Sequence, residues 1–220
     1  RTNSTYDTMP TEYSDMIKCL EAICNMLDGQ VVAVSGDALE RIVHAIIAHM
    51  ADPKVVRLGL KALAKLSTNK ANMLHLAKFP LTADMLQTAM KEYAEDAEDD
   101  GVLRHALDLS NRLAQHRDFR SRFGPIGIPE IIAALRRWPG KALLVGKCIA
   151  ALVVLAKGLP QNVETMSEHD IFGVLASGMS DAWRADRTAI VDVCFLASTL
   201  MYVDEGVADA LQHHRRELQV

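Results

Sequence analysis

The chain has 220 residues and a formal net charge of −4 at pH 7; 50% of its residues are hydrophobic and 5% are aromatic. Its apolar residues are mainly Leu, Ala, Val and Met, a composition typical of close-packed helices rather than of β-sheets. The net negative charge argues against a generally basic nucleic-acid-binding protein. The sequence contains no run of about eighteen apolar residues, so no membrane-spanning helix is predicted.

Five helices are predicted in the first half of the chain. They cover residues 13–27, 38–50, 54–67, 69–78 and 83–95. Residues 1–12 lack periodicity, so we expect a disordered or loosely docked lead-in, followed by a single domain over residues 13–220. Asp37 and Thr82 are expected N-caps, and Asp52 before Pro53 is a typical helix start.

The second half begins with helices predicted at residues 101–115 and 117–123. The segment Gly124–Pro129 then holds two glycines and two prolines, and we expect it to break any helix. Gly127 is expected to need a positive φ angle in this joint. A short helix should start at Pro129 and end at Trp138, and a long helix should follow from Lys141 to Ala156.

The remaining helices are predicted at residues 160–167, 170–179 and 186–202, with a terminal helix at 204–217. The segment Glu92–Asp100 contains six carboxylates. We interpret it as a solvated loop between helices, because its spacing does not match an EF-hand calcium loop. A site for a cation or for a basic partner is the alternative.

Matching leucines recur near the ends of the expected long helices. They are Leu27, Leu66, Leu113, Leu155 and Leu200, at spacings of 39 to 47 residues. The residues four and seven positions before each leucine are apolar or small, as a shared buried seam requires. Because such a helix group cannot bury its apolar faces alone, the spacing predicts a stack of repeated units.

The joint Ile126-Gly127-Ile128-Pro129-Glu130-Ile131-Ile132 resembles the consensus joint between the first and second helices of an armadillo repeat. The segment Lys61–Leu66 similarly resembles the consensus third helix, and the resemblance covers most of Ser14–His214. It implies an all-α fold, a right-handed α-solenoid of about four to five armadillo-like repeats, whose long third helices line a concave face.

The third helices should offer a partner the residues nine, five and one positions before each of these leucines. In the second and third repeats these are Arg57, Lys61, Lys65, Arg104, Asp108 and Arg112, with Asn111 if the register slips by one. The fourth and fifth repeats supply Ala150, Val154, Phe195 and Thr199. We therefore predict a groove that is basic in its middle and apolar at one end, suited to an acidic extended segment. The alternative is a set of solvated side chains on exposed helix faces.

Armadillo proteins that bind basic nuclear-targeting peptides carry a Trp on the third helix and an Asn four residues later. No matching pair of positions here holds Trp and Asn, because Trp138 and Trp183 lie near expected helix ends. The resemblance therefore implies grooves of the kind that bind acidic partner tails, rather than an import receptor.

The sequence holds no strong signal for catalysis or metal binding. It has no GxSxG, Walker or HExxH motif, and His44 and His49 are spaced off a shared helix face. His169 and Asp170 beside Cys148 or Cys194 would be a conceivable nucleophile set, but they fit a helix start better. We expect no enzyme activity, no cofactor and no metal, and we expect all four cysteines to be buried reduced thiols.

The expected function is that of a non-enzymatic cytoplasmic scaffold or adaptor that binds a protein or peptide segment and no small-molecule substrate. One alternative is a structural tether in a larger assembly, using the convex face or the ends. Some small armadillo-only proteins are lipid-anchored organelle tethers, so a membrane would be reached only indirectly or through an N-terminal anchor that precedes Arg1. Nucleic-acid binding by the basic groove is a lesser alternative, because exposed stacking aromatics are absent.

Overall fold

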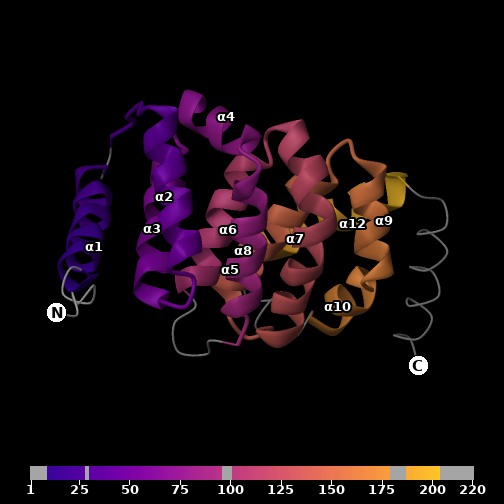
Figure 1. The fold of residues 1–220 in the computed structure, drawn as a ribbon. Coiled ribbons are helices and arrows are strands. Elements are labelled where there is room, and N and C mark those ends of the chain that lie inside the picture. The colour runs from indigo at the N-terminus through magenta and orange to yellow at the C-terminus, as the bar shows by residue number, and fades with distance from the viewer. Residues whose placement is uncertain (1–8, 28–29, 96–100, 179–186, 204–220) are drawn as a thin grey trace.

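The computed structural model describes residues 9–27, 30–95, 101–178 and 187–203, and throughout these segments the chain forms helices and turns without a strand (Figure 1). The predicted all-α fold is therefore confirmed for the described residues. The helices are α1 Met9–Met26, α2 Gly36–Ala48, α3 Pro53–Leu66, α4 Lys70–Lys78, α5 Leu81–Glu92, α6 Gly101–Leu113, α7 Arg117–Arg137, α8 Ala142–Ala156, α9 Pro160–Glu168, α10 Ile171–Gly178 and α12 Arg187–Val203.

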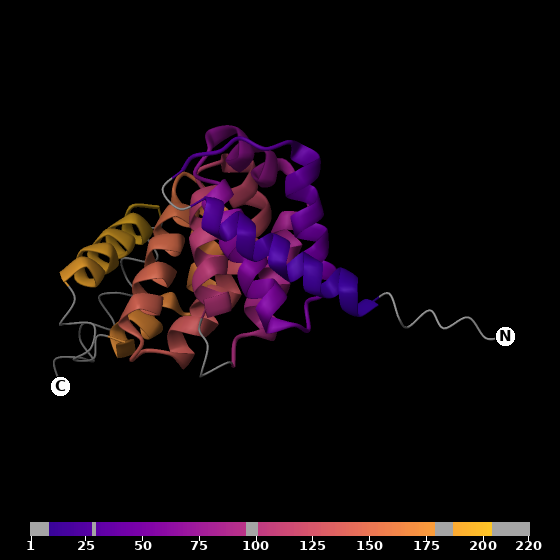
Figure 2. The same ribbon diagram turned by 90° about the vertical axis from the view of Figure 1, so that its left-hand side faces the viewer.

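The helices form a stack with two main layers. In one layer α1 packs on α3, α3 on α6, α6 on α8, and α8 on α12. In the other, α2 packs on α5, α5 on α7, and α7 on α10, while the short helices α4 and α9 bridge neighbouring units. Helix α1 lies at one end of the stack, crossing its front in Figure 2, and α9 and α12 lie at the other end. We refer to α1, α3, α6, α8 and α12 as the third helices.

The predicted leucine seam is buried along the whole stack. Leu27, Leu66, Leu113, Leu155 and Leu200 are all buried at or just past the last turns of the third helices. The residues four positions earlier are also buried, except Ile23, which is partly buried against the core. The spacing in the sequence therefore marks equivalent positions in successive third helices.

Polar contacts between units also recur. The hydroxyl of Tyr93, which follows α5, donates to the carbonyl oxygen of Met50, which follows α2, at 2.8 Å. The indole Nε1 of Trp138, which follows α7, donates to the carbonyl oxygen of Ala94 at 3.0 Å. An aromatic side chain at the end of one helix thus ties it to the end of the preceding equivalent helix.

The predicted break at Gly124–Pro129 is wrong. Helix α7 runs without interruption through this segment and contains Pro125 and Pro129. Both proline rings lie on the less buried side, where carbonyl groups that lose an N–H partner can bond to water. Burial of Phe119, Phe123 and Ile128 on the other side outweighs the cost of about 3 kcal/mol per proline.

Gly127 does not adopt the expected positive φ angle. Among the described glycines a positive φ occurs at Gly158 (φ 69°), just after α8. A Cβ at Gly127 would instead collide with the ring of Phe123, one turn earlier in the same helix. Glycine is therefore required there by a close approach of an aromatic ring.

Several helix starts differ from their predicted positions. Helix α1 begins at Met9 rather than near Tyr13. Ser35, not Asp37, caps α2 by accepting a hydrogen bond from the backbone of Ala38 at 3.4 Å. Helix α5 begins before Thr82, whose buried hydroxyl has no hydrogen-bond partner in the described part of the chain. The predicted cap of α3 at Asp52 is confirmed.

The predicted terminal helix 204–217, most of the acidic loop and Trp183 lie outside the described residues.

Candidate functional site

The predicted groove residues lie on the third helices and are all at least partly accessible. Arg112 and Phe195 are exposed. The partly exposed members are Arg57, Lys61, Lys65, Arg104, Asp108, Asn111, Ala150, Val154 and Thr199. We call the surface formed by these residues the third-helix face. Its exposure leaves the face accessible to a partner.

A cluster of cations from three successive third helices lies in the middle of this face. Lys61 on α3, Arg104 on α6 and Lys147 on α8 all act electrostatically on His105, which is half-buried on α6. The pKa of His105 lies below its usual value, mainly because burial disfavours the imidazolium and further because these three cations repel it, while Asp108 opposes the shift. We call Lys61, Arg104 and Lys147 the basic cluster.

Lys147 was not among the predicted site residues. It lies eight positions before Leu155, one residue away from the positions expected to face a partner. Its ammonium group forms an ion pair with Asp108 across the contact between α8 and α6. A cation at this position could have been noticed in the sequence, but its pairing with a carboxylate on the preceding third helix could not.

Lys65 has a structural role that the sequence did not predict. Its ammonium group donates to the backbone carbonyl oxygen of Cys24 near the end of α1, at 2.8 Å. The contact ties α3 to α1 and holds the charge against the backbone. Lys65 is therefore less available to a partner than Lys61 or Arg112.

Asp108, Asn111 and Arg112 line a shallow hollow of about 480 Å³ at the end of α6. The other lining residues are Ser67, Thr68, Lys70, Met73 and Gln115. These five were not predicted, because they lie in α4 or just after a third helix rather than at the outward positions counted from the leucines. We call this space the α3–α6 hollow.

The helix ends around the α3–α6 hollow are already closed by local hydrogen bonds. Ser67 and Thr68 donate their hydroxyl hydrogens to the carbonyl oxygens of Ala64 and Lys65, at 2.8 and 2.7 Å. In contrast, the side-chain oxygen of Asn111 is buried and accepts no hydrogen bond from the described residues. The polar lining that remains open to a partner includes the cations Lys70 and Arg112.

The far end of the third-helix face carries exposed apolar side chains. On α12 the side chains of Val191 and Phe195, one turn apart, are 64% and 60% exposed. Leu143 at the start of α8 is 60% exposed and was not predicted. Exposed large apolar side chains of this kind often mark contact surfaces for other proteins.

In the described part of the chain, the residues considered for catalysis or metal binding do not form an active centre. Cys148 is fully buried in α8, and burial raises the pKa of its thiol to about 12. Asp170 accepts a hydrogen bond from the backbone of Gly173 at 3.1 Å, as a helix cap does. In the described residues no group of three His, Cys, Asp or Glu side chains is arranged to hold a metal.

The cysteine prediction is correct only in part. Cys24 and Cys148 are buried, but Cys19 and Cys194 are exposed, and all four are free thiols.

No described helix combines the length and the hydropathy needed to cross a bilayer. Comparisons of the chain with protein-family models, with curated proteins and with solved structures returned no match.

Proposed function

We propose that this chain is a non-enzymatic interaction protein that holds an extended, acidic segment of a partner along its third-helix face. The observation that carries the proposal is that three third helices packed in succession, α3, α6 and α8, each place a partly exposed cation on one face: Lys61, Arg104 and Lys147. The repeated leucine seam and the recurrent ties from Tyr93 and Trp138 support the further proposal that the stack is a right-handed solenoid of armadillo-type repeats.

The electrostatics of the face favour an acidic occupant. Neighbouring packed helices lie about 8–10 Å apart, within one Debye length at physiological salt, so a bound carboxylate feels several cations together. Each exposed pair alone contributes less than about 1 kcal/mol, so no single lysine or arginine accounts for binding. The pairing of Lys147 with Asp108 reduces the excess charge, which leaves Lys61 and Arg112 as main carriers of it.

The α3–α6 hollow would receive an acidic side chain of the partner. A carboxylate in it would lie beside Lys70 and Arg112. Phe195 and Val191 would receive an apolar side chain farther along the face.

A nuclear magnetic resonance titration of the full chain tests where an acidic segment binds. The probe is a capped synthetic peptide in which Asp and Leu alternate, and the control peptide alternates Lys and Leu. We expect saturable shifts of backbone amides in α3, α6 and α8 with the acidic peptide and none with the basic one. Equal shifts with both peptides, or the absence of shifts in α3, α6 and α8 with the acidic one, would contradict the proposal.

A further inference from the structure

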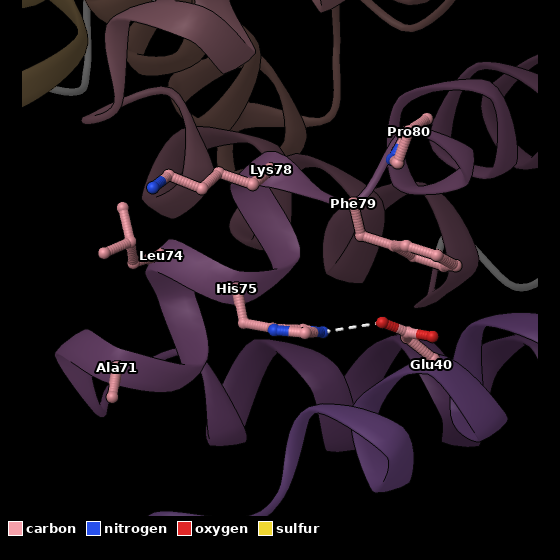
Figure 3. A pocket seen from close by; sticks show the side chains of 7 residues that line it. All are labelled: Glu40, Ala71, Leu74, His75, Lys78, Phe79 and Pro80. Carbon is pink, nitrogen blue, oxygen red and sulfur yellow. Dashed lines mark hydrogen bonds and ion pairs between the residues drawn. The ribbon is translucent and has the colours of Figure 1, made fainter.

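A second hollow, of about 480 Å³, lies between α2 and the end of α4, and no third helix contributes to it (Figure 3). Its apolar lining comes from Ala71, Leu74, Phe79 and Pro80. Leu74 is 36% exposed, whereas Leu76 and Ala77 of the same helix are fully buried. We call this space the α2–α4 hollow.

One wall of the hollow is held in place by Glu40 of α2. The side chain of His75 contacts the Glu40 carboxylate at 2.9 Å, between Nε2 and Oε1. The backbone carbonyl of Glu40 is bonded to Nδ1 of His44 at 2.9 Å, and the His44 ring meets Phe79 edge-on at 5.8 Å. A Cβ at position 36 would collide with the His75 ring, so the absence of a side chain at Gly36 makes room for that ring. These contacts fix the side chains of this wall in the absence of a partner.

Glu40 and Lys78, which both line this hollow, differ in their contacts. The carboxylate of Glu40 is bonded to the His75 ring. In Figure 3 the side chain of Lys78 runs past Leu74 and away from Glu40, and its ammonium group has no ion pair or hydrogen bond to the described residues. Arg122 of α7 donates to the backbone oxygen of Lys78 at 3.3 Å, which places a second cation near the end of α4.

We propose that the α2–α4 hollow is a second docking site, for a partner segment that carries a leucine-like side chain next to a carboxylate. The apolar side chain packs on Leu74, Phe79 and Pro80, and the carboxylate meets the ammonium group of Lys78. A basic segment is disfavoured, because Lys78 would repel it and Oε1 of Glu40 already bonds to His75. The site uses no residue of the third-helix face, so it goes beyond the function proposed above and stands independently of it.

The test uses capped tetrapeptides of the form Ser-Leu-Glu-Ser, titrated into the full chain and followed by backbone amide shifts. Two matched peptides replace Glu by Lys, or Leu by Ala. We expect saturable shifts in residues 36–44 and 71–81 with the Leu-Glu peptide, and binding about tenfold weaker or undetectable with the other two. Lys78→Glu should reverse the preference toward the Leu-Lys peptide, and Leu74→Ser should abolish saturation for all three.

Two control variants separate a local effect from a general one. Lys91→Glu makes the same charge change at an exposed lysine of α5, and Leu143→Ser removes an exposed leucine elsewhere; both should bind the Leu-Glu peptide as the wild type does. Absence of saturable shifts in the hollow, equal binding of the three peptides, or equal loss in Lys91→Glu would overturn the proposal. Concentration-dependent shifts of the same amides without peptide would also overturn it, since they would assign the hollow to a second copy of the chain.

Discussion

Asn162 of α9 donates its side-chain amide to the carbonyl oxygen of Leu155 in the last turn of α8, at 2.8 Å. Asn72 of α4 makes the equivalent bond to Leu66 in the last turn of α3, at 3.0 Å. Each amide also bonds to the preceding unit, Asn162 to the carbonyl oxygen of Arg120 and Asn72 to that of Val32. Two buried asparagines at equivalent positions therefore close the end of one third helix and fasten it to the neighbouring unit.

Replacing Asn162 by alanine should destabilise the stack. The variant leaves the carbonyl oxygens of Leu155 and Arg120 buried without their donor, at a cost of about 2–4 kcal/mol in the free energy of unfolding. Urea denaturation followed by circular dichroism measures this change. Gln161→Ala, at the exposed neighbouring position, is the matched control and should change stability by less than about 0.5 kcal/mol. Equal losses in the two variants would refute the proposed role of the asparagine.

Gly127→Ala should also destabilise the chain, because the added methyl group meets the ring of Phe123 inside α7. We expect a loss of about 1–3 kcal/mol, typical of overpacking. Gly140 follows α7, and a methyl group added there would meet no atom within 4 Å, so Gly140→Ala should be nearly neutral. Thermal denaturation of both variants checks the difference. A neutral Gly127→Ala would show that the close approach to Phe123 is not required.

His105 should make stability depend on pH. Its pKa in the folded chain is lowered, mainly by burial, so the unfolded chain binds the proton more tightly. Its contribution is therefore fully present above the unfolded value of 6.5 and is lost as pH falls below it toward the lowered folded value. We expect the stability of wild type to fall more steeply than that of His105→Gln as the pH drops below 6.5. Parallel pH profiles for the two proteins would contradict this assignment.

The cysteines should differ in reactivity. Cys19 and Cys194 are exposed and should react with iodoacetamide in the folded chain. Cys148 should stay unmodified, because it is buried and its pKa of about 12 leaves almost no thiolate at neutral pH. Peptide mass spectrometry, with and without urea, identifies the modified residues. Rapid labelling of Cys148 without urea would show that α8 is not packed as described.

The sequence was informative wherever a single periodicity dominated. Leu66, Leu113 and Leu155 are buried at equivalent helix ends, as their spacing predicted, because a stack of similar units buries similar positions. The same reasoning identified the outward residues Lys61 and Arg112 on the third helices. Such positions depend on nearby residues in the chain, so a pattern in the sequence is sufficient to find them.

The sequence was misleading where packing between distant segments decides the outcome. Gly124–Pro129 contains strong helix breakers, yet the burial of Phe123 and Ile128 keeps α7 continuous. The bond from Lys65 to Cys24 joins residues in different helices, and no local pattern predicts it. The α3–α6 hollow was also missed, because it forms where the ends of two third helices meet.

The central claim is that the third-helix face binds an acidic segment through its cations. Lys61→Glu combined with Arg112→Glu reverses two charges on this face, and Lys91→Glu combined with Arg117→Glu makes the same net change at exposed positions of α5 and α7. Neither pair includes Lys65, whose contact with Cys24 would confuse binding with stability.

The most direct measurement is the affinity of the labelled Asp-Leu peptide, by fluorescence anisotropy, as a function of salt concentration. We predict that wild type and the control pair bind with affinity that falls as salt rises, and that the Lys61→Glu, Arg112→Glu protein binds about tenfold or more weakly with a flatter salt dependence. Identical affinity and identical salt dependence in all three proteins would contradict the claim that this face is the binding site.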